Sequence, residues 1–182
     1  MPSRRGSKGN TMQAFATETI TRAALSAGLP EGRVMREVAA DNLTLKRPRV
    51  ELRFLPEQYT RTGRKLAVTR TKTEQIRKRE LYEVELTVEA RVEADDEAWL
   101  ESFSRAFIVN LPRGGNDALG NWVRVRVRKG TFWRAPDQRL GEGVIKVFTR
   151  VNRVFALTFT GRITREEREA LIPSHTITAT TK

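Results

Sequence analysis

Three arginines at alternate positions form a regular row of cationic side chains in this sequence. The stretch N-W-V-R-V-R-V-R-K-G-T-F-W, residues 121–133, interleaves arginine with valine between two tryptophans. Strand side chains point to opposite faces with a period of two, so the pattern predicts a strand with Arg124, Arg126 and Arg128 on one face. Guanidinium groups pair with carboxylates and phosphates, so this row needs an acidic strand, an acidic protein or nucleic acid opposite it.

A second strand offers carboxylates at the same spacing. The stretch L-Y-E-V-E-L-T-V-E-A-R-V, residues 81–92, places apolar side chains on one face and Glu83, Glu85 and Glu89 on the other. If the two strands are neighbours in the sheet, these acids pair with the arginine row, and each pair contributes a few tenths to about 1 kcal/mol. We favour this architectural role for the row. Docking on an acidic protein surface and contact with nucleic acid phosphates stay open as alternatives.

Residues suited to catalysis or metal binding are sparse. The chain has no cysteine and a single histidine, His175, which lies among threonines near the C-terminus. Asp95 and Asp96 fit the first turn of a helix expected over 95–111, where the helix dipole favours negative charge. The run R-G-G-N-D at 113–117 follows a helix and lacks the Gly-Lys-Ser/Thr ending of a phosphate-binding loop, so we expect a turn. We therefore expect no enzyme, no cofactor and no metal.

Positive charge is concentrated in two segments of the 182-residue chain. The formal net charge is +12. Residues 1–10 carry three Lys/Arg and no acid, and residues 61–79 carry eight Lys/Arg against one Glu, which leaves about +2 for the rest. No apolar run reaches 18 residues, so we expect an intracellular, soluble protein without a membrane partner.

The basic segment and two aromatic residues are the candidate contact sites. We expect 57–79 to form a protruding hairpin or loop that contacts a neighbouring subunit or an acidic partner, with DNA as an alternative partner and a merely solvated hairpin as the alternative to any contact. Its candidate residues are Arg61, Arg64, Lys65 and Arg70. Phe132 and Trp133 are expected in a loop over 130–142, either at an interface, where Trp is enriched, or capping the open end of the sheet.

The spacing of apolar residues predicts the helices and strands that carry these residues. Three- and four-residue apolar steps predict a helix from Thr11 to the stop at Gly28 and Pro30, and a helical turn or two over 31–40. Alternation predicts a strand ending at Pro56 and a pair of strands about a turn near Asn152-Arg153. With the strands at 81–92 and 121–128 and the helix at 95–111, the fold class expected is α+β. We expect an antiparallel sheet of about four to five strands with helices packed on one side.

The domain organisation expected is simple. Residues 1–10 form a flexible basic arm, residues 11–166 form a single α+β domain, and residues 167–182 form a C-terminal tail. The stretch from residue 165 onward starts with a helix-like composition and ends in threonine-rich sequence.

This order of elements resembles that of the tail terminator and head–tail joining (neck) proteins of tailed bacteriophages. In that family an N-terminal helix precedes a strand like P-R-V-E-L-R-F-L-P-E, and a long strand runs into a helix, as E-L-Y-E-V-E-L-T-V-E-A-R-V-E-A-D-D-E-A-W-L does here. The likeness covers roughly residues 11–166.

The resemblance implies a non-enzymatic structural protein of the virion tail or neck, assembled in the host cytoplasm. Its copies would form a ring, commonly sixfold, that caps the tail tube and joins it to neck or connector proteins. DNA would pass through the ring without being read. The alternative is a basic nucleic-acid-binding module that uses residues 1–10 and 61–79.

Overall fold

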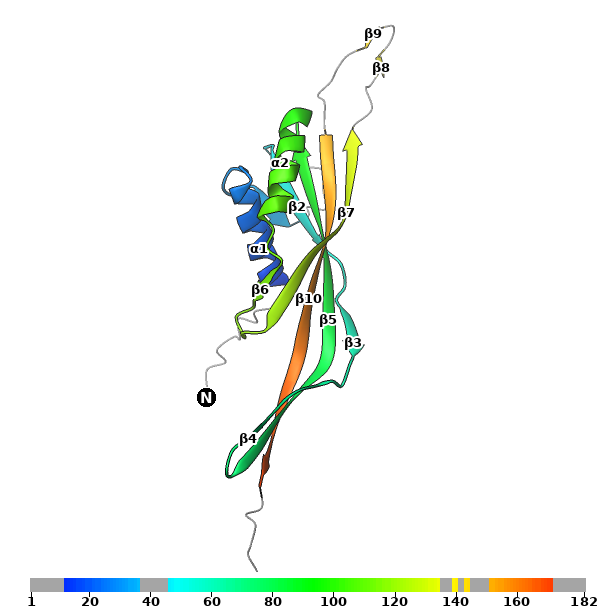
Figure 1. Cartoon of the computed structure of the whole chain (residues 1–182). Helices are drawn as coiled ribbons and strands as arrows, with labels where there is room; N and C mark the ends of the chain where they lie inside the picture. Colours follow the sequence, from blue (N-terminus) through cyan, green and yellow to red (C-terminus); the bar gives the residue numbers. More distant parts are fainter. Residues whose placement is uncertain (1–11, 37–45, 135–138, 141–142, 145–150, 172–182) are drawn as a thin grey trace, which may run out of the picture. The chain divides into compact units, whose positions relative to one another are not determined.

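The chain divides into two compact units. A computed structural model describes residues 12–36, 46–134, 139–140, 143–144 and 151–171, and Figure 1 shows the chain. The body comprises Met1–Gln58 and Glu85–Gly161, and the small unit comprises Tyr59–Val84 and Arg162–Lys182. Two long strands, β5 (Glu74–Ala94) and β10 (Val151–Ala170), contribute to both units.

Eight strands form one mixed sheet. The order is β1-β2-β5-β10-β7-β6, and β3 and β4 pair with β5. β1 is parallel to β2, whereas β2–β5, β4–β5, β10–β7 and β6–β7 are antiparallel. The bounds not yet given are β1 Val34–Arg36, β2 Arg49–Phe54, β3 Gln58–Arg61, β4 Lys65–Arg70, β6 Gly114–Asn116 and β7 Trp122–Arg134. A separate two-stranded sheet joins β8 (Arg139–Leu140) to β9 (Gly143–Val144).

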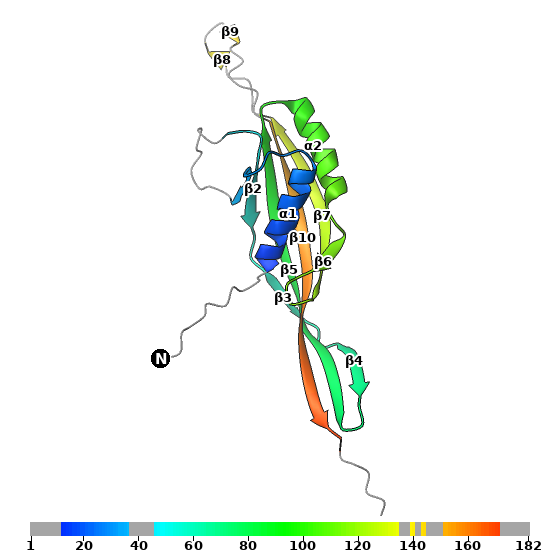
Figure 2. The same cartoon turned by 90° about the vertical axis from the view of Figure 1, so that its left-hand side faces the viewer.

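Both helices of the body lie on the same face of its sheet (Figures 1 and 2). α1 (Met12–Ser26) buries Ile20 and three of its alanines (Ala16, Ala23 and Ala24), and α2 (Glu97–Asn110) buries Leu100, Phe103 and Phe107. The ring of Phe107 lies 5.4 Å from that of Phe155 on β10. The core between helices and sheet comes from alternate residues of the four central strands: Val50, Leu52, Leu86, Val88, Ala90, Val92, Phe155, Leu157, Phe159, Val123 and Val125.

The helix ends match local sequence signals. Asp96 is the N-cap of α2, and its carboxylate accepts hydrogen bonds from the backbone N–H groups of Ala98 (3.0 Å) and Trp99 (3.3 Å). α1 ends before Gly28, whose φ of 97° is in the left-handed region that glycine adopts without strain. Among the described residues, no helix is long and apolar enough to span a bilayer.

The small unit is built from strands alone in the described part of the chain. β4 and the first half of β5 form a hairpin, and the C-terminal half of β10 lies beside β5, so the order is β4–β5–β10. The N–H of Leu171 donates to the carbonyl of Thr73 at 2.9 Å. The basic segment expected to be a hairpin or loop therefore forms β3, β4 and the start of β5, with β3 and β4 both paired to β5.

The fold class expected from the sequence is wrong. The protein is mostly sheet, with eight strands in one mixed sheet and two helices in the described residues, in place of an α+β fold with four to five antiparallel strands. The additional strands are short, as β1 and β6 are, or exposed along their length, as β3 and β4 are. Because neither kind buries one face, neither shows the alternation on which the expectation rested.

Three local expectations also fail. Residues 34–36 form β1, not a helical turn, and residues 37–40 lie outside the described part. Asn152 and Arg153 lie inside β10, not in a turn. β10 continues to Ala170, so the helix-like start of the tail is strand. Its composition, E-E-R-E-A, favours helix, but propensity is a weak prior that pairing with β5 overrides.

Candidate interaction surfaces

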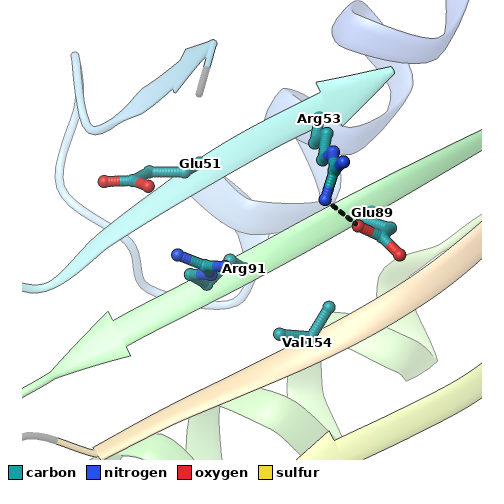
Figure 3. A pocket seen from close by; sticks show the side chains of 5 residues that line it. All are labelled: Glu51, Arg53, Glu89, Arg91 and Val154. Atoms are coloured by element: carbon teal, nitrogen blue, oxygen red, sulfur yellow. Dashed lines mark ion pairs between the residues drawn. The ribbon is translucent and has the colours of Figure 1, made fainter. Parts of the chain in front are cut away.

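The sheet face of the body opposite the helices carries charged side chains in a ladder between β2 and β5. Arg49 is opposite Glu93, Glu51 is opposite Arg91, and Arg53 is opposite Glu89. Figure 3 shows the last two pairs around a shallow depression that also includes Val154 of β10. The charges R-x-E-x-R on one strand face E-x-R-x-E on the other, so every directly opposed pair has opposite sign.

Burial increases toward one end of this ladder. The Arg49 side chain is 3% exposed, and its Nε lies 2.7 Å from Glu51 Oε1 while its Nη2 lies 2.5 Å from Glu93 Oε2. Arg47 adds contacts to Glu93 at 3.6 Å and to Asp95 at 3.1 Å. The Arg53–Glu89 pair at 3.6 Å is largely exposed. The ladder therefore links β2, β5 and the entry to α2 by charge, and its components neutralise one another.

The arginine row on β7 does not face the glutamate strand, so the expectation that the two strands are neighbours is wrong. β10 lies between β5 and β7, and it places Thr160 opposite Arg124 and Thr158 opposite Arg126. One of the expected pairs does form: the Arg128 side chain extends across β10, and its Nη2 lies 3.7 Å from Glu85 Oε2. Its Nε also donates to Thr158 Oγ1 at 3.3 Å.

The glutamates have other partners or positions. Glu89 pairs with Arg53 of β2, on the side of β5 away from β7. Glu83 belongs to the small unit. Neutral threonines of β10 therefore replace the expected carboxylates beside Arg124 and Arg126.

A β-bulge extends the cationic row of β7. The register with β10 shifts between Ala156 and Leu157, so β7 has one extra residue there, Arg128. Lys129 is opposite Ala156 and Trp133 is opposite Asn152, which places both on the face of Arg126. We define the cation row as Trp122, Arg124, Arg126, Arg128, Lys129 and Trp133, all exposed on this face.

Sequence reasoning did not foresee two members of the cation row as site residues, Trp122 and Lys129. Alternation already placed Trp122 on the arginine face, which is a signal that could have found it. In a regular strand, Lys129 would lie on the face opposite to that of the arginines. The bulge places it on their face, and the sequence gives no local signal for the bulge.

Phe132 and Trp133 lie in β7, so the loop expected over 130–142 does not begin at residue 130. Residues 135–138 and 141–142 are outside the described part. Phe132 is opposite Arg153 and faces the helix side, where the Arg153 guanidinium lies 5.6 Å from its ring centroid. The two aromatic residues are 42% and 49% exposed and point to opposite faces of the sheet.

A shallow depression beside α2 contains one titratable group with a perturbed pKa. Glu97, Ala98, Glu101, Phe132 and Arg153 line it. Arg153 Nη2 donates to Glu101 Oε2 at 2.7 Å, and this hydrogen bond, with a contribution from Arg105, lowers the pKa of the Glu101 carboxyl. The depression is thus closed on one side by a fixed ion pair.

The small unit exposes both its charged and its apolar side chains. Arg61 lies on β3, Lys65 and Arg70 lie on β4, and Arg64 lies between the strands; all four are exposed. Residues 59–83 and 162–171 bury two side chains, and both are polar: Gln75 and Glu80. The large apolar side chains exposed there are Tyr59, Leu66, Val68, Tyr82 and Ile163, between 37% and 55%.

Ion pairs join the strands of the small unit. Arg77 lies 3.1 Å from Glu169, and Arg79 lies 3.8 Å from Glu167. Glu80, although 1% exposed, has Arg162 Nε at 3.2 Å from its Oε2. These contacts fix β5 against β10 by charge where a hydrophobic core is missing.

The residues considered for catalysis cap a helix, form an ion pair or pair in a strand, or they lie outside the described part of the chain. Asp96 caps α2, as expected for a first-turn acid, and Asp95 pairs with Arg47. The run at 113–117 contains β6, which pairs with β7 and opens no helix. His175 is outside the described residues. Within the ranges that the structure describes, no three His, Cys, Asp or Glu side chains are grouped to hold a metal ion.

The cation row and the small unit are the two candidate interaction surfaces of the protein. A comparison with protein-family models gives no match for the chain, and a comparison with curated proteins gives none either.

Proposed function

We propose that this protein is a structural subunit that assembles with copies of itself into a ring, of the tail terminator kind at the head–tail junction of a tailed bacteriophage. In this role it caps a tail tube and joins it to neck or connector proteins. The observation that carries the proposal is the small unit, which exposes most of its large apolar side chains and its strand edges and, among its described residues, buries one apolar side chain, Val84.

A three-stranded sheet needs a hydrophobic face packed on something to be stable by itself. The small unit has the apolar side chains for such a face, among them Leu66, Val68 and Ile163, but they are exposed. Burying apolar surface contributes about 25 cal/mol per Å². A surface of this kind therefore supports association, and it is costly to keep exposed in a monomer.

The strand edges of the small unit favour another copy of the same chain as the partner. β4 pairs with β5 on one side only, and the register of β10 with β7 ends at Thr160, so the described residues leave the outer edges of β4 and of residues 162–170 unpaired. The β4 edge carries Lys65 and Arg70 and no acid, whereas residues 162–170 of β10 carry three glutamates and three arginines, whose charges cancel. Pairing of the β4 edge of one copy with the β10 edge of the next is a head-to-tail contact, which closes into a ring when the rotation permits.

The test is the mass of the full chain in solution. Light scattering on a size-exclusion column should give several times the 20.8 kDa of one chain, with about sixfold for the expected ring, and negative-stain images should show closed rings. Replacing Leu66 and Val68 with serine should reduce the mass toward one chain. Since both side chains are exposed, the melting temperature of the dissociated variant should change little.

A matched control uses exposed apolar residues of the body, Val109→Ser and Leu119→Ser, which are 82% and 77% exposed. This variant should keep the mass of the wild type. A wild-type protein that is monomeric at every concentration, or a mass that falls equally in both variants, would contradict assembly through the small unit.

A further inference from the structure

We infer that the cation row of β7 is a binding site for the phosphate backbone of single-stranded nucleic acid. The site lies in the body, on the sheet face opposite the helices, and uses none of the residues through which the proposed ring assembles. It also differs from the basic segment 61–79, in which most of the excess charge of the sequence is concentrated.

The geometry of the row suits a repeating anion. Alternate residues of a strand are about 6.8 Å apart, which sets the spacing of Arg124 and Arg126. Arg128, the bulge residue, follows them on the same face. The backbone of an extended nucleic acid strand presents its phosphates at a comparable interval. The bulge adds Lys129 to the same face, so four consecutive cations follow the strand.

The charges of the row are largely uncompensated. Arg128 contacts Glu85, but no carboxylate lies within 4.0 Å of Arg124, Arg126 or Lys129 among the described residues. Their cross-strand partners on β10 are Thr160, Thr158 and Ala156, which are neutral. The neighbouring β2–β5 ladder shows how this sheet compensates arginines that serve structure: each faces a glutamate. An unpaired row of like charges costs stability, which an anionic ligand offsets on binding.

The tryptophans at both ends favour nucleic acid over an acidic protein segment. Trp122 and Trp133 are 58% and 49% exposed and lie on the face of the cations. Proteins that bind single strands combine a cationic track with aromatic side chains on which bases stack. Duplex bases are already stacked on one another, so only a single strand can use both features.

Gly114 holds Trp122 in this position. A Cβ at Gly114 would lie 2.7 Å from the indole ring, so the tryptophan packs over the space that the missing side chain leaves. Gly114 is opposite Arg124, which places the indole beside the first arginine of the row.

The experiment measures binding of the full chain to a fluorescently labelled thymidine 20-mer by anisotropy at several salt concentrations. The row variant is Arg124→Gln/Arg126→Gln/Lys129→Gln. Its control is Arg61→Gln/Lys65→Gln/Arg70→Gln, which removes the same three charges from the small unit. The row variant should bind at least tenfold more weakly than wild type, the control less than threefold. The slope of log K against log salt should become shallower by about 0.7 for each phosphate that the variant no longer neutralises, or about 2 in total.

Two further measurements separate the site from its alternatives. Trp122→Ala and Trp133→Ala should each weaken binding about fivefold or more, because stacking of one base contributes about 1–3 kcal/mol. A duplex of the same length should bind more weakly than the single strand. Equal loss in both triple variants, tighter binding of the duplex, or binding of polyglutamate without binding of the oligonucleotide would overturn the inference.

The outcome is independent of the ring. The row variant should keep the mass of the wild type in light scattering, so loss of DNA binding with intact assembly separates the two proposals. If the triple variant has a lowered melting temperature, the single change Arg126→Gln at an exposed position replaces it in the test. This variant should bind the oligonucleotide more weakly than wild type and show a smaller salt dependence of binding.

Discussion

Replacing Arg49 with methionine tests whether charge holds β2 on β5. The side chain is 3% exposed and lies between Glu51 (8% exposed) and Glu93 (18% exposed). Methionine keeps the length and the apolar stem of arginine but removes the guanidinium, so the change leaves two poorly solvated carboxylates without their shared partner. Glu93 keeps Arg47 at 3.6 Å, whereas no other ion pair of Glu51 within 4.0 Å is seen in the described residues.

The expected magnitude follows from this difference. Breaking a buried pair by removing one partner costs about 3–5 kcal/mol, and because Glu93 is compensated, the lower end, about 3 kcal/mol, is expected. For a chain of this size that lowers the melting temperature by about 6–12 °C. Urea denaturation followed by far-UV circular dichroism measures the free energy of unfolding directly.

The double variant Arg49→Met/Glu51→Met is the decisive control. If the cost arises from an unpaired buried carboxylate, removing that carboxylate should recover more than half of it, since apolar replacement of a buried pair is often neutral or stabilising. The exposed pair Arg53–Glu89 provides the comparison, and Arg53→Met should cost about 0.5 kcal/mol. The explanation by an unpaired buried carboxylate would be wrong if the free energy of unfolding of the single variant lay within about 1 kcal/mol of wild type. It would also be wrong if the costs of the two changes were additive in the double variant.

Three further predictions concern single positions. Arg153→Met should raise the pKa of Glu101 toward its ordinary value in an NMR titration; in the wild type, the stability from this pair is present above the ordinary pKa and is lost as pH falls through the lowered one. Asp96→Ala should destabilise the protein by about 1 kcal/mol in urea denaturation, because two backbone N–H groups of α2 lose their acceptor. Gly114→Ala should cost about 1–3 kcal/mol in the same assay, since its Cβ would lie 2.5 Å from the backbone oxygen of Val123.

Elements with one buried face were predictable from sequence. The helix expected over 95–111 is α2 (Glu97–Asn110), and the strand ending near Pro56 is β2 (Arg49–Phe54). Both have apolar residues at the period of their own structure and polar residues at their ends, so pattern and packing agree. The helix from Thr11 is confirmed as α1 for the same reason.

The small unit could not be predicted in the same way. Its strands have polar or exposed residues on both faces, as in β4, where all six side chains are exposed. Alternation of apolar and polar residues indicates a strand with one buried face. A sheet whose apolar side chains are exposed lacks that signal. Composition correctly located the unusual segment at 57–79, but its pairing with residues 162–170 joins parts about 90 residues apart, which no local pattern records.

The ladder between β2 and β5 shows what the sequence did contain. R-V-E-L-R and E-A-R-V-E read in opposite directions place unlike charges opposite each other at all three positions. A shift by two residues places like charges opposite one another over most of the ladder, so the charges specify the register as well as stabilise it. Comparing charge patterns between strands would have assigned Glu89 to β2 and left the β7 arginines without that partner.

The two arginine-bearing strands therefore differ in function because of their middle residue and because of the strands that lie beside them. In R-V-E-L-R of β2 and R-V-R-V-R of β7, charged residues alternate with valine or leucine, although Val127 of β7 is exposed. β2 supplies its own acid at the middle position and its neighbour supplies two more. β7 supplies none, and β10 brings threonine and alanine to its side. On this face of the body, one set of arginines is compensated and the next is nearly bare. A polyanion that approaches the face is therefore drawn to β7 and away from the neutral ladder.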